Sequence, residues 1–122
     1  MVTSQEKQQQ HKKKWKSIQD FLRYNTGYKI HGVARAGSTV EGGWTLESDL
    51  DIRFAIANDP SKTKIYPNLR TKLREGFPDA SVEIGKSYNV INMEIGELEF
   101  DIVLLTVKEF DTQVREEKLR RT

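Results

Sequence analysis

The chain contains no cysteine, and it contains no long hydrophobic run. Without cysteine it can form neither a disulfide bond nor a zinc site with thiolate ligands. No apolar stretch approaches the length of about 20 residues that a membrane-spanning helix needs, and the N-terminus lacks the hydrophobic region of a signal peptide. We therefore expect a soluble, cytoplasmic protein with no membrane partner.

Hydrophobic residues are also few, at 36%, whereas charged residues make up 31% of the 122 positions. A chain of this length is expected to form one domain over residues 1–122. Periodic apolar runs in the middle of the chain exclude disorder. The composition therefore indicates a small core under a well-solvated surface.

Neither sign of charge dominates, because the chain contains 20 basic and 18 acidic residues. The first 35 residues nevertheless contain only Glu6 and Asp20 as acids, against Lys7, Lys12, Lys13, Lys14, Lys16, Arg23, Lys29 and Arg35. Such a block can follow a polyphosphate backbone, and Lys12–Lys16 could guide an RNA. The solvated face of a terminal helix is the commoner role, and we favour it here.

The spacing of Trp15, Ile18, Phe21 and Leu22 predicts a helix over residues 4–25 with its apolar side chains on one side. Residues 1–12 lack this apolar stripe and are expected to fray. A second helix is predicted over residues 61–76, where Pro67 should kink or split it.

Strands are predicted on both sides of the second helix, with a hairpin turn at Gly96-Glu97. A charged, helix-prone tail follows from Val107. This order predicts an α+β fold, a mixed, mostly antiparallel sheet of about five strands with helices on one face. The predicted strands cover residues 28–38, 49–56, 80–87, 89–95 and 98–106.

Two of these strands carry aspartates on the face opposite their apolar side chains. In "DLDIRFAI", Asp49 and Asp51 alternate with apolar residues, and Asp101 has a similar place in "LEFDIVLLT". Alternate residues of a strand lie roughly 6.6 Å apart, so their carboxylates can converge on a cation. Carboxylates gathered in this way repel one another, and Mg²⁺ prefers such oxygen ligands. We interpret the three aspartates as magnesium ligands.

Gly37-Ser38 precedes Asp49 with ten residues between them. Glycine allows close backbone approach to an anion, and the serine hydroxyl can donate to a phosphate oxygen. Lys86, with Ser87 at a strand end, is a further candidate for phosphate or base contact. Each signal alone is common in surface loops, but together they indicate a site for a nucleoside triphosphate.

The combination resembles the DNA polymerase β-like nucleotidyltransferase superfamily over residues 30–105. Within it, "GSTVEGGWTLESDLDI" looks most like the branch of archaeal-type CCA-adding enzymes and oligoadenylate synthetases. The chain is also similar in size and spacing to the minimal nucleotidyltransferases found as antitoxin partners.

The resemblance implies transfer of a nucleoside monophosphate, with AMP favoured, from an NTP to a hydroxyl of RNA or a nucleotide, releasing pyrophosphate. Gly37 and Ser38 would contact the triphosphate of the ATP. Asp49 and Asp51 would hold two Mg²⁺ or Mn²⁺ ions, and Asp101 would hold the ion that activates the attacking hydroxyl. Larger relatives have a second, helical domain, so a protein partner or a homodimer is expected to replace it.

Two alternatives stay open. The chain could adenylylate a partner protein, as the antitoxin-like relatives do, or it could be a catalytically inactive nucleotide- or RNA-binding domain of the same fold. All three acids are present, which argues against an inactive domain because a binding module gains little from their mutual repulsion.

Overall fold

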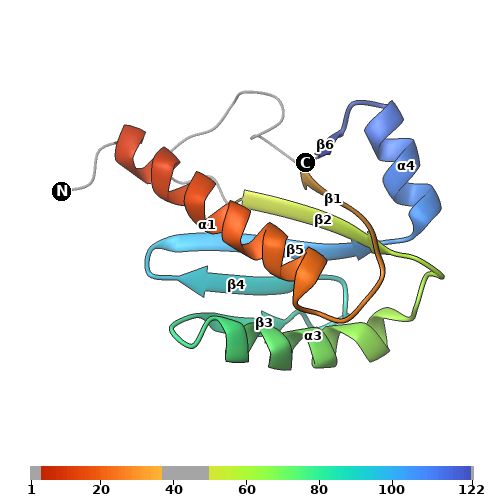
Figure 1. Ribbon diagram of the computed structural model, residues 1–122, viewed down its shortest axis with the longest axis horizontal. Coiled ribbons are helices and arrows are strands. Elements are labelled where there is room, and N and C mark those ends of the chain that lie inside the picture. The colour runs from red at the N-terminus through yellow and green to blue at the C-terminus, as the bar shows by residue number, and fades with distance from the viewer. Residues whose placement is uncertain (1–3, 37–49, 122) are drawn as a thin grey trace.

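The structure, a computed structural model, describes residues 4–36 and 50–121 (Figure 1). Its strands form one sheet of six in the order β3-β4-β5-β2-β1-β6. β2 and β5 pair in parallel and the other neighbours pair antiparallel. The α+β fold with a mixed, mostly antiparallel sheet is thus confirmed. The elements are α1 (Ser4–Tyr24), β1 (Ile30–Ala36), β2 (Leu50–Ile56), α3 (Lys62–Gly76), β3 (Ser81–Ile84), β4 (Ile91–Ile95), β5 (Leu98–Leu105), α4 (Val107–Arg115) and β6 (Leu119–Arg121).

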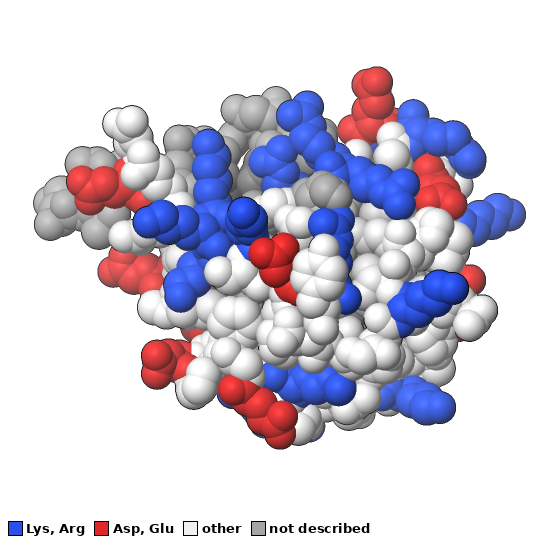
Figure 2. Space-filling view, in the orientation of Figure 1, with Lys and Arg blue, Asp and Glu red and all other residues white. Residues whose placement is uncertain are grey.

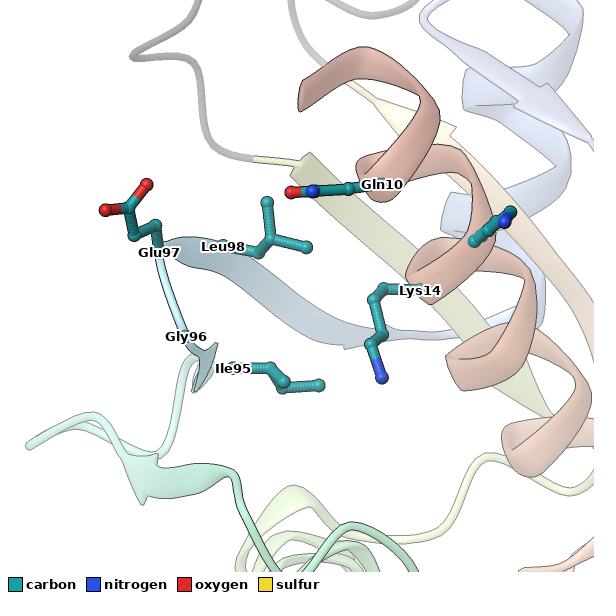
Figure 3. A pocket seen from close by; sticks show the side chains of 7 residues that line it. Gln10, Lys14, Ile95, Gly96, Glu97 and Leu98 are labelled. Carbon is teal, nitrogen blue, oxygen red and sulfur yellow. The ribbon is translucent and has the colours of Figure 1, made fainter. Parts of the chain in front are cut away.

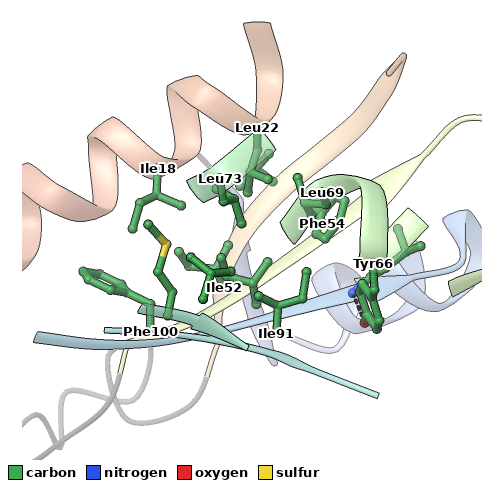
Figure 4. Packing of buried hydrophobic residues seen from close by; sticks show 14 of the residues in the cluster. Ile18, Leu22, Ile52, Phe54, Tyr66, Leu69, Leu73, Ile91 and Phe100 are labelled. Carbon is green, nitrogen blue, oxygen red and sulfur yellow. Dashed lines mark hydrogen bonds between the residues drawn. The ribbon is translucent and has the colours of Figure 1, made fainter. Parts of the chain in front are cut away.

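The main core lies between one face of the sheet and the helices α1 and α3 (Figure 4). Alternation along β2 and β5 directs every second side chain into it, as the sequence predicts. Figure 4 shows Ile18 and Leu22 of α1 and Leu69 and Leu73 of α3 pointing toward these strands. The buried side chains from the two strands are Leu50, Ile52, Phe54, Ile56, Leu98, Phe100, Ile102 and Leu104.

The predicted N-terminal helix extends further toward the N-terminus than its apolar stripe does. α1 begins at Ser4, so residues 4–12, which the sequence predicts to fray, are helical here. The helix ends at Tyr24, and Gly27 adopts a φ of 78°, a left-handed conformation that suits glycine after a helix. Within the described part of the chain, every helix is too short or too polar to cross a lipid bilayer.

Pro67 does not split the second helix, since α3 continues through it from Lys62 to Gly76. A proline inside a helix removes one backbone hydrogen bond. Here Ile65, Tyr66, Leu69 and Leu73 are all buried on one side of the helix. Tertiary packing supplies most of a helix's stability, and this buried face explains why the helix tolerates the loss.

The C-terminal tail differs from the prediction in two ways. Residues 119–121 form β6, so the sheet has six strands within the described residues instead of about five. α4 packs on the face of the sheet opposite α1 and α3, so the helices do not all cover one face. Small side chains on that face of β1 and β2 leave room for Phe110, and a Cβ added to Gly32 would lie 2.7 Å from the ring. This second cluster contains Ala34, Ala36, Ala55, Leu105, Phe110 and Leu119.

The side chains of β1 do not alternate strictly between the two faces of the sheet, because the register of this strand is broken. The pairing of β1 with β2 shifts between Ile30 and Gly32, which marks a bulge or similar irregularity. An extra residue in one strand returns the next side chain to the same face. Ile30 and Val33 can therefore both pack against the main core, although they are three residues apart.

A buried tyrosine completes the hydrogen bonding of β5. The Tyr66 hydroxyl accepts a hydrogen bond from the Leu104 backbone N–H at 2.9 Å (Figure 4). β4 begins at Ile91, opposite Ile102, so Leu104 lies beyond the reach of that strand. Burial raises the pKa of Tyr66, and the bond from Leu104 partly opposes the rise. The phenol is therefore neutral near pH 7.

We expect Tyr66→Phe to reduce the free energy of unfolding by about 1–3 kcal/mol, because the buried N–H of Leu104 loses its acceptor. Urea denaturation measures the change. Tyr28→Phe is the matched control, since the Tyr28 hydroxyl accepts its hydrogen bond from Asn68 at the surface. Equal losses in the two variants would contradict the structural role of Tyr66.

α4 is also joined to β1 by an ion pair between His31 Nε2 and Asp111 Oδ1, which are 2.8 Å apart. The hydrogen bond from His31 lowers the pKa of Asp111. A carboxyl whose pKa is lower in the folded chain stabilises the fold above its unfolded pKa, and the contribution disappears as the pH falls through the folded value.

We therefore expect Asp111→Asn to lower the melting temperature at neutral pH, with the difference from the unsubstituted chain disappearing below about pH 4. Thermal unfolding over a pH series measures it. Asp79→Asn, at an exposed position outside the ion pairs of the described residues, is the control. A difference that persists at low pH would show that the ion pair is not its source.

Candidate active site

The structure brings Asp51 and Asp101 together at the centre of the sheet. They are directly paired in the parallel register of β2 and β5, and neighbouring strands lie about 4.8 Å apart. Leu50 and Ile52 on β2 point into the main core, as do Phe100 and Ile102 on β5. Both aspartates therefore project from the opposite face, where their side chains are half-buried. The two side chains therefore leave neighbouring positions on the same face.

The end of β1 lies next to this pair. Ala36, the last residue of β1, is the register partner of Asp51 on the side away from Asp101. Gly37 and Ser38 follow Ala36 in the sequence. Gly37, Ser38 and Asp49 lie outside the described residues, so their predicted roles stay predictions. β1 nevertheless ends beside Asp51, and the predicted phosphate-binding residues follow directly in the sequence.

Lys86 is not brought to the two aspartates along the sheet. It is exposed, with Ser87, in the turn between β3 and β4, where the N–H of Gly85 donates to the Val90 carbonyl at 2.9 Å. β3 is an edge strand, two strands away from β5. The contact of Lys86 with a nucleotide therefore stays a prediction.

A positive group lies on the same face as the carboxylates. Arg53 follows Asp51 by two positions on β2 and pairs with Val103 of β5. Its Nη1 donates to the Ile52 carbonyl at 3.2 Å. The guanidinium is thus held against its own strand, and its positive charge contributes to lowering the pKa of Tyr66 against the larger effect of burial.

The acidic side chains in the described part of the chain match part of the ligand set of a magnesium ion. Within residues 4–36 and 50–121, no group of three or more His, Cys, Asp or Glu side chains could hold a metal ion. Asp49, the predicted third carboxylate, is outside these ranges. Magnesium commonly uses one or two carboxylates together with waters and substrate phosphates. Asp51 and Asp101, adjacent on one face, meet that requirement.

A shallow pocket with a volume of ≈ 480 Å³ lies between α1 and the turn from β4 to β5 (Figure 3). Ile95 and Leu98 line it from the strands, and Figure 3 shows Lys14 extending from α1 toward Ile95. Leu98 belongs to the main core and Ile95 packs against it. The pocket therefore lies on the opposite side of the sheet from the two aspartates and is not part of the candidate site.

Basic side chains gather over α1 (Figure 2). Lys12, Lys13, Lys14 and Lys16 are exposed on this helix, which covers the face of the sheet opposite the carboxylates. This arrangement agrees with the solvated helix face that the sequence favours. An acceptor RNA lying along these lysines would have to pass around the edge of the sheet to reach Asp51 and Asp101.

The sequence matches no protein-family model and no curated protein. The fold, however, is found in solved structures. It is similar to a chain in the solved structure of the E. coli MS115-1 CdnC:HORMA-deltaN complex, with a TM-score of 0.56 and 19% sequence identity. The alignment covers 81% of this chain and 34% of that chain, so the protein spans about a third of the length of its structural neighbour. At this identity the likeness establishes the fold.

Proposed function

We propose that this chain is the catalytic core of a magnesium-dependent nucleotidyltransferase. It would transfer AMP from ATP to a hydroxyl of RNA or of a nucleotide and release pyrophosphate. The observation that carries the proposal is the direct pairing of Asp51 with Asp101 beside the end of β1. The structural neighbour CdnC is itself a nucleotidyltransferase, which supports transfer chemistry of this general kind.

In the proposed reaction, the acceptor oxygen attacks the α-phosphorus of ATP. A new P–O bond forms, the bond to the β-phosphate breaks, and pyrophosphate leaves with the electron pair while the hydroxyl proton passes to solvent. Magnesium, when bound, lowers the pKa of the hydroxyl and neutralises charge on the leaving group. Asp51 and Asp101 would hold it together with Asp49, and Mn²⁺ would serve as well.

The remaining sequence-predicted residues have supporting roles in the proposal. Gly37 and Ser38 would hold the triphosphate, since a glycine-bounded loop after a strand exposes N–H groups to an anion. Lys86 would contact the nucleotide if the substrate extends toward the β3 edge. The neighbour's complex with HORMA-deltaN is consistent with a protein partner for this chain too, with a homodimer as the other arrangement.

Transfer of label from α-³²P-ATP tests the proposal. The protein is incubated with Mg²⁺ and labelled ATP alone, with an RNA oligonucleotide, or with a tyrosine-containing peptide. Label in the RNA or in a dinucleotide product, accompanied by pyrophosphate release, is the expected result. Label on the peptide or on the protein itself would favour protein adenylylation. ATP binding with no transfer in any tube would favour an inactive binding domain.

A further inference from the structure

A second neighbour of Asp101 lies on β4. Asn92 is its direct partner in the antiparallel register of β4 and β5, on the side away from Asp51. Ile91 and Met93, which flank Asn92, are buried in the main core, so the amide projects from the face that carries the carboxylates. Asp101 is therefore flanked by an amide on one strand and a carboxylate on the other.

We propose that Asn92 is a positioning residue of the candidate site, an inference that rests on the proposed function. In this role the side-chain amide of Asn92 turns to one oxygen of the Asp101 carboxylate when the metal binds, and it leaves the other oxygen for the metal. Carboxylates that bind metals are commonly oriented by such donors. The sequence alone gives no indication of this role, because an exposed asparagine in a short strand is unremarkable until the register is known.

The distances in an antiparallel pair permit the contact. Side chains directly opposite each other have Cβ atoms about 4.5–5.5 Å apart, and Asn and Asp each extend beyond Cβ by two further atoms. The side chain of Asn92 is exposed and takes part in none of the side-chain hydrogen bonds among the described residues, the pair with Asp101 included. Its amide can therefore turn to the carboxylate without losing an existing partner.

The charge of the neighbouring positions favours an amide here. Glu83 of β3 is the partner of Asn92 on its other side, and Arg74 forms an ion pair with Glu83 at 3.1 Å. A neutral donor at position 92 separates Glu83 from Asp101 and supplies an N–H. A carboxylate at the same position would extend the row of like charges, which is unfavourable in directly opposed pairs.

Binding of Mn²⁺ in the presence of α,β-methylene-ATP tests the inference without a transfer assay. Electron paramagnetic resonance of free Mn²⁺ gives the affinity. We expect Asn92→Ala to weaken Mn²⁺ binding by about 10- to 100-fold, as loss of such a donor does at other metal sites. Asn92→Gln should recover part of the loss because it restores the amide. Ser81→Ala, at an exposed position of β3 two strands from β5, is the control and should bind normally.

Asn92→Asp separates orientation from charge. If position 92 acted only through its charge or as a further ligand, the added carboxylate of Asn92→Asp would strengthen Mn²⁺ binding. That result would overturn the inference. Unchanged Mn²⁺ binding by Asn92→Ala would overturn it as well. Asp101→Asn is measured in parallel. Weakened binding in Asp101→Asn with normal binding in Asn92→Ala rejects only the role of Asn92. Normal binding in Asp101→Asn and Asp51→Asn rejects the proposed function as well.

Discussion

Asn in place of Asp101 is expected to reduce nucleotidyl transfer by about 100- to 1,000-fold or more. The replacement keeps the size of the side chain and removes its charge beside Asp51, its partner in the parallel register. Removing one group directed at charge that develops during the reaction typically costs this much in kcat. Asp51→Asn should have an effect of similar size, because both carboxylates belong to the proposed site. Release of pyrophosphate and labelled product from α-³²P-ATP measures the rates.

The double variant Asp51→Asn with Asp101→Asn gives a sharper expectation. Residues that act as a unit have non-additive effects, so the double variant should be little slower than either single one. Far-ultraviolet circular dichroism should show an intact fold in all three, since both side chains project from the face of the sheet opposite the main core. Glu97→Gln, an exposed acid in the β4–β5 turn, is the charge-matched control. Transfer that survives in the double variant would mean that the metal site lies elsewhere.

Truncation of Phe100 to alanine is expected to have the largest effect on stability. Phe100 is fully buried in the main core, on the strand position just before Asp101, and its ring meets the edge of His11 at a centroid distance of 6.0 Å. Replacement of a buried phenylalanine by alanine typically costs about 3–5 kcal/mol, since apolar contacts are lost and a cavity remains. Urea denaturation measures the free energy of unfolding.

Tyr24→Ala is the matched truncation for Phe100→Ala. Tyr24 ends α1 with 76% of its surface exposed, so the same kind of change there should alter stability by about 0.5 kcal/mol or less. A loss below about 1 kcal/mol in Phe100→Ala would contradict the placement of this side chain between β5 and α1.

Local patterns in the sequence are sufficient to predict most of the helices and strands. Alternation along β2 and β5 predicts which face each side chain takes, because a strand has a period of two. The hairpin at Gly96-Glu97 is confirmed by the pairing of Ile95 with Leu98, and Gly96 has the positive φ of 60° that a tight hairpin turn needs. These features depend on residues close together in the chain.

Features that depend on distant residues were harder to predict. The three residues of β6 are too few for a periodic signal, and the strand exists because β1 pairs with it. The face covered by α4 is set by small side chains on β1 and β2, which no pattern within α4 reveals. Likewise, the two aspartates could be assigned to one face of each strand, but only the sheet order makes β2 and β5 neighbours.

The parallel pairing of β2 and β5 has a consequence for how activity is lost on denaturation. The segment that joins these two strands contains α3, β3 and β4, so their pairing closes this whole segment into a loop. Contacts between residues so far apart in sequence form late relative to local ones, at the cost of closing a long loop. We therefore expect the proposed transfer activity to be lost whenever β2 and β5 separate, because this pairing alone makes the two acids neighbours.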